Sequence, residues 1–379
     1  MLHFPTVELH RHFEAGLLPE TIATLAARHG VTEARTRSGS VVDGVDPQSP
    51  ESIRAYYASV AAGFGLPDGF TRFYQSFGLP LSVLRSLEDL EQAVFEQVAW
   101  CAERGSLHTE LRGSPFTYQE QIDAPIDEIA AALVAGVDRA WRERRASGTF
   151  ILAFSRQKGL APPGALPAQR QAEPIARLAA TLHRGDRPVG LDIAGFPERP
   201  WPPRLFESAL APAREAGVPL TVHAVEQGRF PDFADAPPAL IVEAVERLGA
   251  RRIGHGTSLA SSLAARDVVH DRGVGVECCP LSNARMGFVP VEDHPLPLLL
   301  ADGLCVSLST DDPLMFGPFT VAETFDEIAG PLSLDVSSLL TLTRNGIESA
   351  FVTDQRRSLL RRRLQALAAD GGADASRRI

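Results

Sequence analysis

The chain is poor in cysteine, has no long apolar run and carries no excess of positive charge. Its four cysteines include no C-x-x-C pair, which argues against both a disulfide-rich secreted scaffold and a thiolate zinc motif. No stretch approaches the roughly 18 consecutive apolar residues of a membrane span, and no apolar signal-peptide segment occurs near the first residues. We therefore expect a cytoplasmic protein without a membrane anchor.

The net charge of -10 has the wrong sign for a protein that binds a nucleic-acid backbone, which requires a basic surface. This charge does not exclude a small nucleoside without phosphate. With 44% hydrophobic and 22% charged residues, the chain can bury a large core. We expect a small-molecule partner and no nucleic-acid or membrane partner, and we leave the oligomeric state open.

Short β-like segments alternate with amphipathic helical segments along the chain. This alternation predicts an α/β protein with a parallel sheet, and eight such units predict a (β/α)8 TIM barrel. We expect one domain over residues 1–367 and a flexible tail over 368–379. The predicted strands are 6–9, 107–112, 149–154, 189–194, 220–224, 252–254, 273–278 and 305–309. The helices predicted between them are 127–145, 174–183, 205–216, 238–248 and 263–272.

The first predicted connection, residues 13–106, is much longer than the others and forms a helical insertion. An insertion at this end of a barrel strand commonly builds a lid or a substrate wall. Residues 35–50 within it are rich in Ser, Gly, Asp and Pro, which predicts either a plain surface loop or a loop that closes over the substrate. The helices predicted in the insertion are 19–29, 52–64, 69–77 and 87–104.

Polar residues that can bind a metal follow several of the predicted strands. His10 and His12 follow the first strand, and side chains at i and i+2 of an extended segment point the same way. His223 ends the fifth strand and Asp311 follows the eighth. Active sites of such barrels lie at the carboxyl ends of the strands. Three imidazole nitrogens and one carboxylate oxygen would hold one Zn2+ and leave a position open for water.

Three further residues at the same ends have catalytic side chains. His255, after the sixth strand, can orient the water or take its proton. Glu226, three residues after His223, can carry a proton to the leaving side of the substrate. Asp312 can accept a hydrogen bond from substrate, and the alternative is a helix cap before Pro313.

At this point the sequence resembles a known family. The matching segments run in order from Glu8 to Phe316, and they are ELHRHFEAGLLPE, GLDIAGFPE, LTVHAVE, RIGHGTSL, CCPLSN and SLSTDDPLMF. They resemble the adenosine deaminase family of the amidohydrolase superfamily. The resemblance implies a hydrolase with one zinc ion per chain, which replaces the 6-amino group of a purine nucleoside by oxygen.

The resemblance also implies a role for each site residue. His10, His12, His223 and Asp311 would hold zinc. Glu226 would protonate purine N1 and His255 would assist the attacking water. Asp312 would contact N7, and the backbone N–H of Gly195 would contact N3.

The sequence departs from the family pattern near the expected sugar end of the substrate. Glu14-Ala15 stands where adenosine-specific members have an Asp-Gly that contacts the ribose 5′-hydroxyl, Val225 replaces a glycine, and Phe196-Pro197 replaces an acidic segment. These changes favour 6-aminodeoxyfutalosine, a precursor in menaquinone biosynthesis with an apolar aryl arm and a carboxylate. Adenosine and adenine are the alternatives.

Apolar and basic residues are available for such an arm. The candidates for the apolar wall are Phe13, Phe73 and Phe196, and those for the carboxylate are Arg35, Arg37 and Arg72. Phe73 and the nearby Phe77 are equally well explained as core residues at helical spacing.

Two other functions are possible for this fold. A different hydrolysis is disfavoured because no lysine at a strand end could bridge two metals. A catalytically dead ligand-binding homologue is disfavoured because all four candidate ligands are present together with Glu226 and His255.

Arg112 and Arg156 follow two of the predicted strands and either support the metal site or pair with a nearby carboxylate. His294, without a spacing partner, is given no role.

Overall fold

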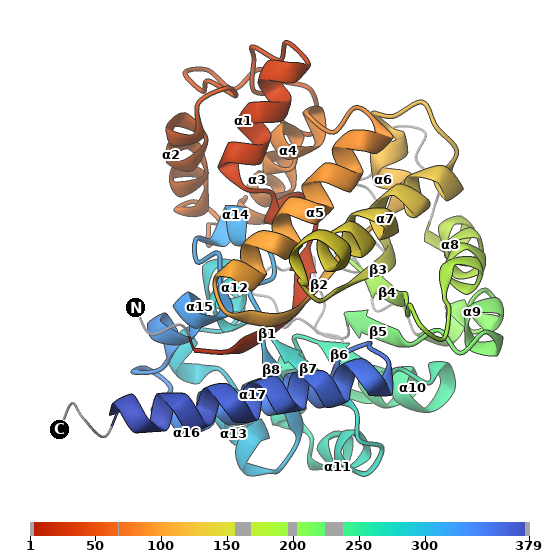
Figure 1. Ribbon diagram of the computed structural model, residues 1–379, viewed down its shortest axis with the longest axis vertical. Helices are drawn as coiled ribbons and strands as arrows, with labels where there is room; N and C mark the ends of the chain where they lie inside the picture. The colour runs from red at the N-terminus through yellow and green to blue at the C-terminus, as the bar shows by residue number, and fades with distance from the viewer. Residues whose placement is uncertain (1–3, 67, 156–167, 196–202, 224–237, 376–379) are drawn as a thin grey trace.

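The computed structural model describes residues 4–375 except 67, 156–167, 196–202 and 224–237 (Figure 1). Eight parallel strands form one sheet in chain order, from β1 to β8. Helices surround them, so the predicted (β/α)8 TIM barrel is confirmed (Figure 1). The strands are β1 Thr6–His12, β2 Ser106–Gly113, β3 Gly148–Ser155, β4 Gly190–Ala194, β5 Leu220–His223, β6 Arg252–Gly254, β7 Gly275–Cys278 and β8 Cys305–Leu308.

The barrel is nearly closed by contacts between β1 and the residues that follow β8. The N–H of His12 donates to the carbonyl of Asp311 at 3.0 Å, and the N–H of Asp311 donates to the carbonyl of His10 at 2.8 Å. Strand β1 is three residues longer than predicted, because Arg11 and His12 still pair with Leu111 and Arg112 of β2. The two predicted metal-binding histidines of β1 are therefore held on a rigid strand.

The helical elements agree with the predicted ones except at two positions. Helix α8 begins at Ala168, six residues before the predicted start. The single helix predicted over 205–216 is two short elements, η2 and α9. Pro212 accounts for this break, because proline lacks the N–H that a helix interior requires but fits the first turn, where it lies in α9. The helices up to β3 are α1 Pro19–Arg28, α2 Pro50–Ala61, α3 Gly69–Ser76, α4 Gly78–Ser82, α5 Leu87–Glu103, α6 Pro115–Gln119 and α7 Ile126–Arg144, with η1 Glu14–Gly16.

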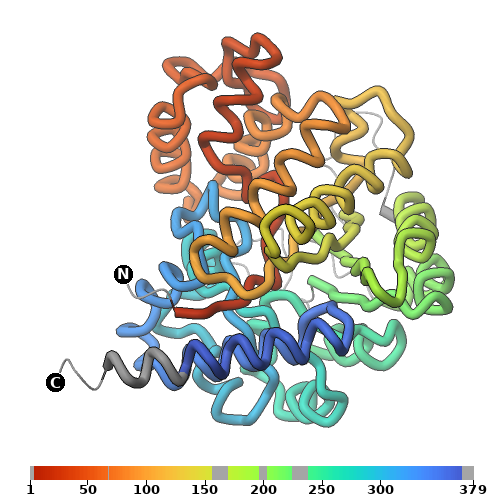
Figure 2. The backbone as a smooth tube through the Cα atoms, viewed as in Figure 1, coloured from red at the N-terminus to blue at the C-terminus, as the bar shows by residue number. Residues whose placement is uncertain are grey.

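The remaining helices complete the barrel wall and its amino-terminal end. They are α8 Ala168–Leu182, η2 Pro203–Phe206, α9 Ala211–Glu215, α10 Pro238–Leu248, η3 Thr257–Ser261, α11 Leu263–Asp271, α12 Pro280–Arg285, η4 Val291–Asp293, α13 Leu296–Ala301, α14 Pro313–Phe316, α15 Val321–Ile328, α16 Val336–Ser349 and α17 Asp354–Ala375. Helix α17 crosses the lower face in Figure 2, and its Leu360 and Leu364 pack in one cluster with Val7 and Leu9 of β1. It extends into the predicted tail, so residues 368–375 are helical.

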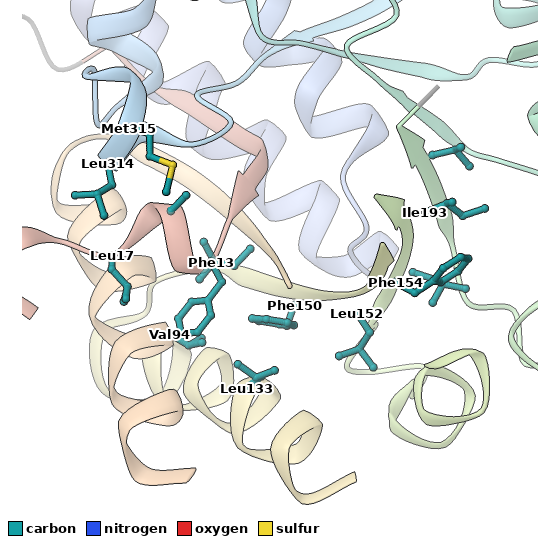
Figure 3. Close-up of a cluster of buried hydrophobic side chains, with 14 of the residues drawn as sticks. Phe13, Leu17, Val94, Leu133, Phe150, Leu152, Phe154, Ile193, Leu314 and Met315 are labelled. Carbon is teal, nitrogen blue, oxygen red and sulfur yellow. The ribbon is translucent and has the colours of Figure 1, made fainter. Parts of the chain in front are cut away.

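The long insertion after β1 packs onto the barrel through an apolar layer. Figure 3 shows Phe13, Val94 of α5, Leu133 of α7 and Phe150 of β3 meeting between strands and helices. The burial of these side chains favours folding, and it holds the insertion at the end of the barrel where β1 terminates. None of the helices in the described ranges is long and apolar enough to cross a membrane.

Candidate metal centre

Four side chains converge where β1, β5 and β8 end. Nε2 of His223 lies 3.1 Å from Nε2 of His10 and 3.2 Å from Nε2 of His12. Oδ1 of Asp311 lies 3.4 Å from Nε2 of both His10 and His12. A tetrahedral zinc ion with bonds of about 2.0 to 2.1 Å keeps its ligand atoms about 3.3 Å apart. These four separations fit such an ion.

Outer carboxylates orient two of the imidazoles. Nδ1 of His10 lies 2.6 Å from Oε2 of Glu277, and Nδ1 of His223 lies 3.0 Å from Oδ1 of Asp192. Each Nδ1–H donates to its carboxylate, so in the neutral ring Nε2 carries a lone pair. Two lone pairs facing each other at 3.1 Å repel, and a cation between them turns this repulsion into coordination. Burial lowers the pKa of His223, which favours this neutral form.

A buried network of charges fixes the outer carboxylates. Glu277 accepts hydrogen bonds from Arg112 at 2.8 Å, Arg252 at 2.5 Å and Thr221 at 2.9 Å. Burial alone would raise the pKa of Glu277, but the two guanidinium groups outweigh it and hold that pKa well below its usual range. Arg112 also reaches Asp192 at 3.1 Å. His10 and His223 are thus held by carboxylates that stay ionised inside the barrel.

Two residues of the site adopt a left-handed backbone conformation that non-glycine residues rarely take. The φ angle is 67° at Asp311 and 60° at His255. At Asp311 the backbone is held by its hydrogen bonds to β1, and Oδ2 accepts from the Ser282 hydroxyl at 2.5 Å. Such conformations persist where the surrounding structure determines them, which is common at functional sites.

His255 is held by a relay that runs away from the metal centre. The backbone N–H of Leu296 donates to Nδ1 of His294 at 3.2 Å, so the proton of neutral His294 is on Nε2. Nε2 of His294 lies 3.2 Å from Oδ1 of Asn283, and Nδ2 of Asn283 lies 3.2 Å from Nδ1 of His255. His255 therefore accepts at Nδ1 and carries its proton on Nε2, which lies 4.0 Å from Oδ2 of Asp311.

The state of His294 supports this direction of the relay. Burial lowers the pKa of His294 to about 3, so the ring is neutral at physiological pH. A neutral ring has one donor and one acceptor, and the N–H of Leu296 occupies the acceptor. The sequence reasoning missed His294 because its partner Asn283 lies in another element and no spacing links the two.

The other predicted site residues lie as follows. Asp312 is buried and occupies the N-cap position of α14, as the alternative predicted, but its side chain makes no capping hydrogen bond there. Gly195 follows β4 with a φ angle of 83°, which favours glycine. Glu14 lies in η1, where its Oε2 accepts from the Tyr118 hydroxyl at 2.7 Å, and burial raises its pKa. Glu226 lies outside the described residues.

The residues proposed for an aryl arm are engaged elsewhere. Phe13 is fully buried against Tyr118, and Phe73 stacks on Phe316 with ring centres 5.5 Å apart, so both belong to the core. Each candidate arginine has an acidic partner: Arg35 pairs with Glu33, Arg37 with Glu120 and Arg72 with Asp68. Phe196, Pro197, Val225 and Arg156 lie outside the described residues.

Residues 35–50 are tied to the insertion rather than extended into solvent. Arg37 of this segment pairs with Glu120, which ends α6, and the N–H of Arg37 donates to the carbonyl of Gln75 at 2.9 Å. The segment thus contacts both α3 and α6. Both predictions for it, a surface loop and a loop that closes over the substrate, remain predictions.

Cys279 lies beside His255 and Asp311, close enough for its sulfur to join them around a metal. Burial raises the pKa of the Cys279 thiol well above its usual value, with the Asp311 charge adding to the effect. A neutral thiol is a poor metal ligand. The histidine and aspartate set is therefore the better candidate.

Known proteins resemble this chain over nearly its whole length. A family model described as adenosine deaminase matches residues 5–367. An adenine deaminase of Paraburkholderia phytofirmans is 32% identical over 96% of this chain and 93% of that protein. An adenosine deaminase of Shewanella denitrificans is 27% identical over 94% of this chain and 97% of that protein.

Solved structures share the fold of this chain. The crystal structure of an adenine deaminase from Arthrobacter aurescens superposes with a TM-score of 0.77 at 26% identity and covers 96% of this chain and 99% of that one. An amidohydrolase from Burkholderia ambifaria, solved with bound zinc, superposes with a TM-score of 0.75 at 21% identity, covering 98% and 93%.

Proposed function

Because the chain belongs to the adenosine deaminase family, whose members are hydrolases acting on C–N bonds, we propose that it hydrolyses the 6-amino group of a purine. Water adds its oxygen to C6, the C6–N bond breaks, and ammonia leaves. The observation that carries this proposal is the set of three imidazole nitrogens and one carboxylate oxygen at tetrahedral separations.

The metal is part of the same proposal. His10, His12, His223 and Asp311 would hold one Zn2+ per chain, since their atoms and separations suit that ion. When bound, the ion would supply a water acidic enough to act as hydroxide near neutral pH. Family membership supports a metal-dependent reaction, and the choice of zinc rests on the ligand types.

For His255 we infer the role of hydrogen-bond donor. The sequence left two roles open, to orient the attacking water or to take its proton. The relay through Asn283 places the imidazole proton on Nε2, on the side of Asp311. A base needs a free lone pair at that nitrogen, whereas a donor stabilises the oxygen that develops negative charge as it attacks C6.

The purine contacts follow from the family pattern. Glu226 would deliver a proton to N1, which makes C6 more electrophilic. Asp312 would contact N7, and the N–H of Gly195 would donate to N3. In support, Asp312 is buried next to a ligand and its carboxylate does not cap α14.

Among 6-aminopurines we propose free adenine as the favoured substrate. Glutamate at position 14 is one methylene longer than the aspartate of adenosine-specific members, so its carboxylate takes up space where the sugar would lie. The Tyr118 hydroxyl holds that carboxylate at 2.7 Å. The relatives named adenine deaminase also match this chain at higher identity than those named adenosine deaminase.

A second candidate is 6-aminodeoxyfutalosine, which would place the enzyme in menaquinone biosynthesis. Glu14 supports it, because this residue also stands in relatives similar to the deaminases of that compound. The expected aryl-arm residues Phe13 and Phe73 are buried in the core, and each candidate arginine is ion-paired. The free thiols are consistent with a cytoplasmic location, which belongs to this proposal too.

The test is ammonia release by zinc-loaded protein from adenine, adenosine and 6-aminodeoxyfutalosine, with Glu226→Gln as the inactive control. We expect adenine to be fastest. A faster reaction with 6-aminodeoxyfutalosine would favour the second candidate. A faster reaction with adenosine would show that Glu14 does not exclude the sugar. If no 6-aminopurine released ammonia from metal-loaded protein, the deaminase proposal would fail and a ligand-binding homologue would replace it.

The variant Glu14→Asp sharpens the choice. Shortening the carboxylate opens the expected sugar space, so we predict that the ratio of adenosine to adenine turnover rises. Tyr118→Phe is the matched control, because it removes the hydroxyl that holds Glu14 without shortening the carboxylate.

A further inference from the structure

A second cavity lies at the opposite end of the barrel from the metal centre. It has a volume of about 620 Å3 and is bounded by α7, the first residues of β3, the turn before β4 and the turn between α16 and α17. Ser147 and Pro188, which line it, precede β3 and β4, whereas the metal centre lies where the strands end. We call this space the amino-terminal cavity.

Three guanidinium groups line the amino-terminal cavity, from Arg184, Arg187 and Arg356, against the two carboxylates of Asp138 and Asp186. Arg187 uses its Nη1 to pair with Asp138 at 2.5 Å. Among the described residues, no carboxylate lies within ion-pair distance of Arg184 or Arg356. The cavity therefore carries an excess of positive charge in a chain whose net charge is -10.

Two of these guanidinium groups bury N–H atoms that lack an acceptor. Nε of Arg187 and Nη1 of Arg356 are both inaccessible to solvent and have no hydrogen-bond partner in the described part of the chain. An unsatisfied buried donor is unfavourable, and one on a charged group more so. Because neither atom is accessible, an anion in the cavity would pair with the other guanidinium N–H groups of Arg356 and with Arg184.

The guanidinium group of Arg356 is held against the ring of Trp141 at the cavity wall. Its guanidinium carbon lies 3.3 Å from the ring centre of Trp141, so the planar group is stacked and its direction is set. Burial lowers the pKa of Arg356, and the charges of Arg145 and Arg363 lower it further. This clustering of like charges is unfavourable until an anion binds.

The start of α17 borders the cavity. Thr353 lines the cavity and caps this helix, accepting from the N–H of Arg356 at 3.1 Å. The amino-terminal end of a helix carries partial positive charge, and the acidic Asp354 in the first turn offsets it. The positive charge of the cavity therefore comes from its arginines and not from the helix end.

We propose that the amino-terminal cavity is a second ligand site, which binds a small molecule with a phosphate or carboxylate group on a flat apolar body. The oxyanion would pair with Arg356 and Arg184, since guanidinium groups bind both kinds of oxyanion through paired hydrogen bonds. The apolar body would lie against Val134 and Val137, which line the cavity. The volume suits a molecule up to the size of a nucleotide.

Calorimetric titration with 1-naphthyl phosphate and 1-naphthoate tests the site, with inorganic phosphate and 1-naphthol as probes for the head group and the body alone. We expect saturable binding of at least one naphthyl anion, with at least tenfold higher affinity than either part. Tighter binding of the phosphate or of the carboxylate identifies the oxyanion. Absence of saturable binding for both anions at millimolar concentration would overturn the proposal.

Variants locate the binding. Arg356→Gln and Arg184→Gln should each weaken the naphthyl anion about tenfold or more, because a charge-assisted hydrogen bond is lost. Arg177→Gln on the exposed face of α8 is the matched control and should leave binding unchanged. Arg184 is exposed, so its variant stays informative even if Arg356→Gln misfolds. If Arg184→Gln and folded Arg356→Gln both bound the naphthyl anion with unchanged affinity, this cavity would be excluded as its binding site.

Discussion

The inside of the barrel and the layer between barrel and helices are built from opposite kinds of side chain. Inside, Glu277, Arg112 and Arg252 are fully buried and ion-paired. Between strands and helices, Leu133 and Phe150 are equally buried but apolar (Figure 3). Apolar burial supplies stability, whereas buried ion pairs contribute little net stability and are costly to break. The comparison teaches that the apolar layer stabilises the fold, whereas the charged interior orients the residues of the candidate metal site.

The largest expected effect comes from removing a ligand of the candidate metal. His223→Ala leaves two histidines and Asp311, so we expect metal content near zero and turnover at least about a thousandfold lower, since hydroxide is no longer formed near neutral pH. Metal analysis and ammonia release measure this. Full turnover by a metal-free variant would contradict the assignment.

Breaking the charged interior should affect both stability and the metal. Glu277→Ala leaves Arg112 and Arg252 without their shared carboxylate and frees the ring of His10. We expect a loss of about 3–5 kcal/mol in the free energy of unfolding. Metal affinity should fall about 10- to 100-fold. Denaturant unfolding and metal titration test this. An unchanged metal affinity would show that the charged network does not support metal binding.

Breaking the apolar layer should affect stability alone. Leu133→Ala removes a fully buried side chain from α7 and should cost about 2–5 kcal/mol of unfolding free energy through lost burial and a cavity. Metal affinity and KM should be unchanged, because the side chain lies between helix and strand. A drop in metal affinity as large as that of Glu277→Ala would end the distinction between the two regions.

The relay to His255 should affect turnover more than stability or metal. Asn283→Ala removes the donor to Nδ1 of His255 and releases the ring from the tautomer set through His294. We expect kcat to fall about 10- to 100-fold with metal content and KM little changed. His294→Ala should act in the same direction. Equal kcat for the wild type and both variants would show that the hydrogen bonds through Asn283 and His294 do not contribute to catalysis.

The smallest effect is a pH dependence at the amino-terminal end of the interior. Burial raises the pKa of Glu110, but the Arg252 charge and the contact with His108 outweigh it, so the folded pKa lies below the usual value of 4.5. Such a group stabilises the fold above its unfolded pKa, and this stabilisation is lost as the pH falls through the folded pKa. The difference in unfolding free energy between the wild type and Glu110→Gln should therefore become smaller as the pH is lowered from 5 toward 3. Denaturant unfolding at several pH values measures this difference. A constant difference would contradict the shift.

The residues that the sequence could reveal are those that follow strands. His10, His12, His223 and Asp311 were predicted to lie together because strand ends converge in a barrel and such side chains can bind metals, and the structure brings them together. Asp192 and Glu277 were missed because each lies within an apolar strand, where a single carboxylate has no partner at a recognisable spacing. Arg112 was placed correctly near the site, but only the structure shows that it serves two carboxylates at once.

The sequence by itself determined the alternation of strands and helices, the long insertion after the first strand and the set of polar residues at the strand ends. These depend on periodicity and local composition, which short segments carry. Only the tertiary structure decided which nitrogen of His255 bears its proton, which carboxylates hold His10 and His223, and that cationic side chains from the turn before β4 and from α17 share one cavity. The physical reason is that hydrogen-bond direction and charge balance depend on partners brought together from distant parts of the chain by closure of the barrel.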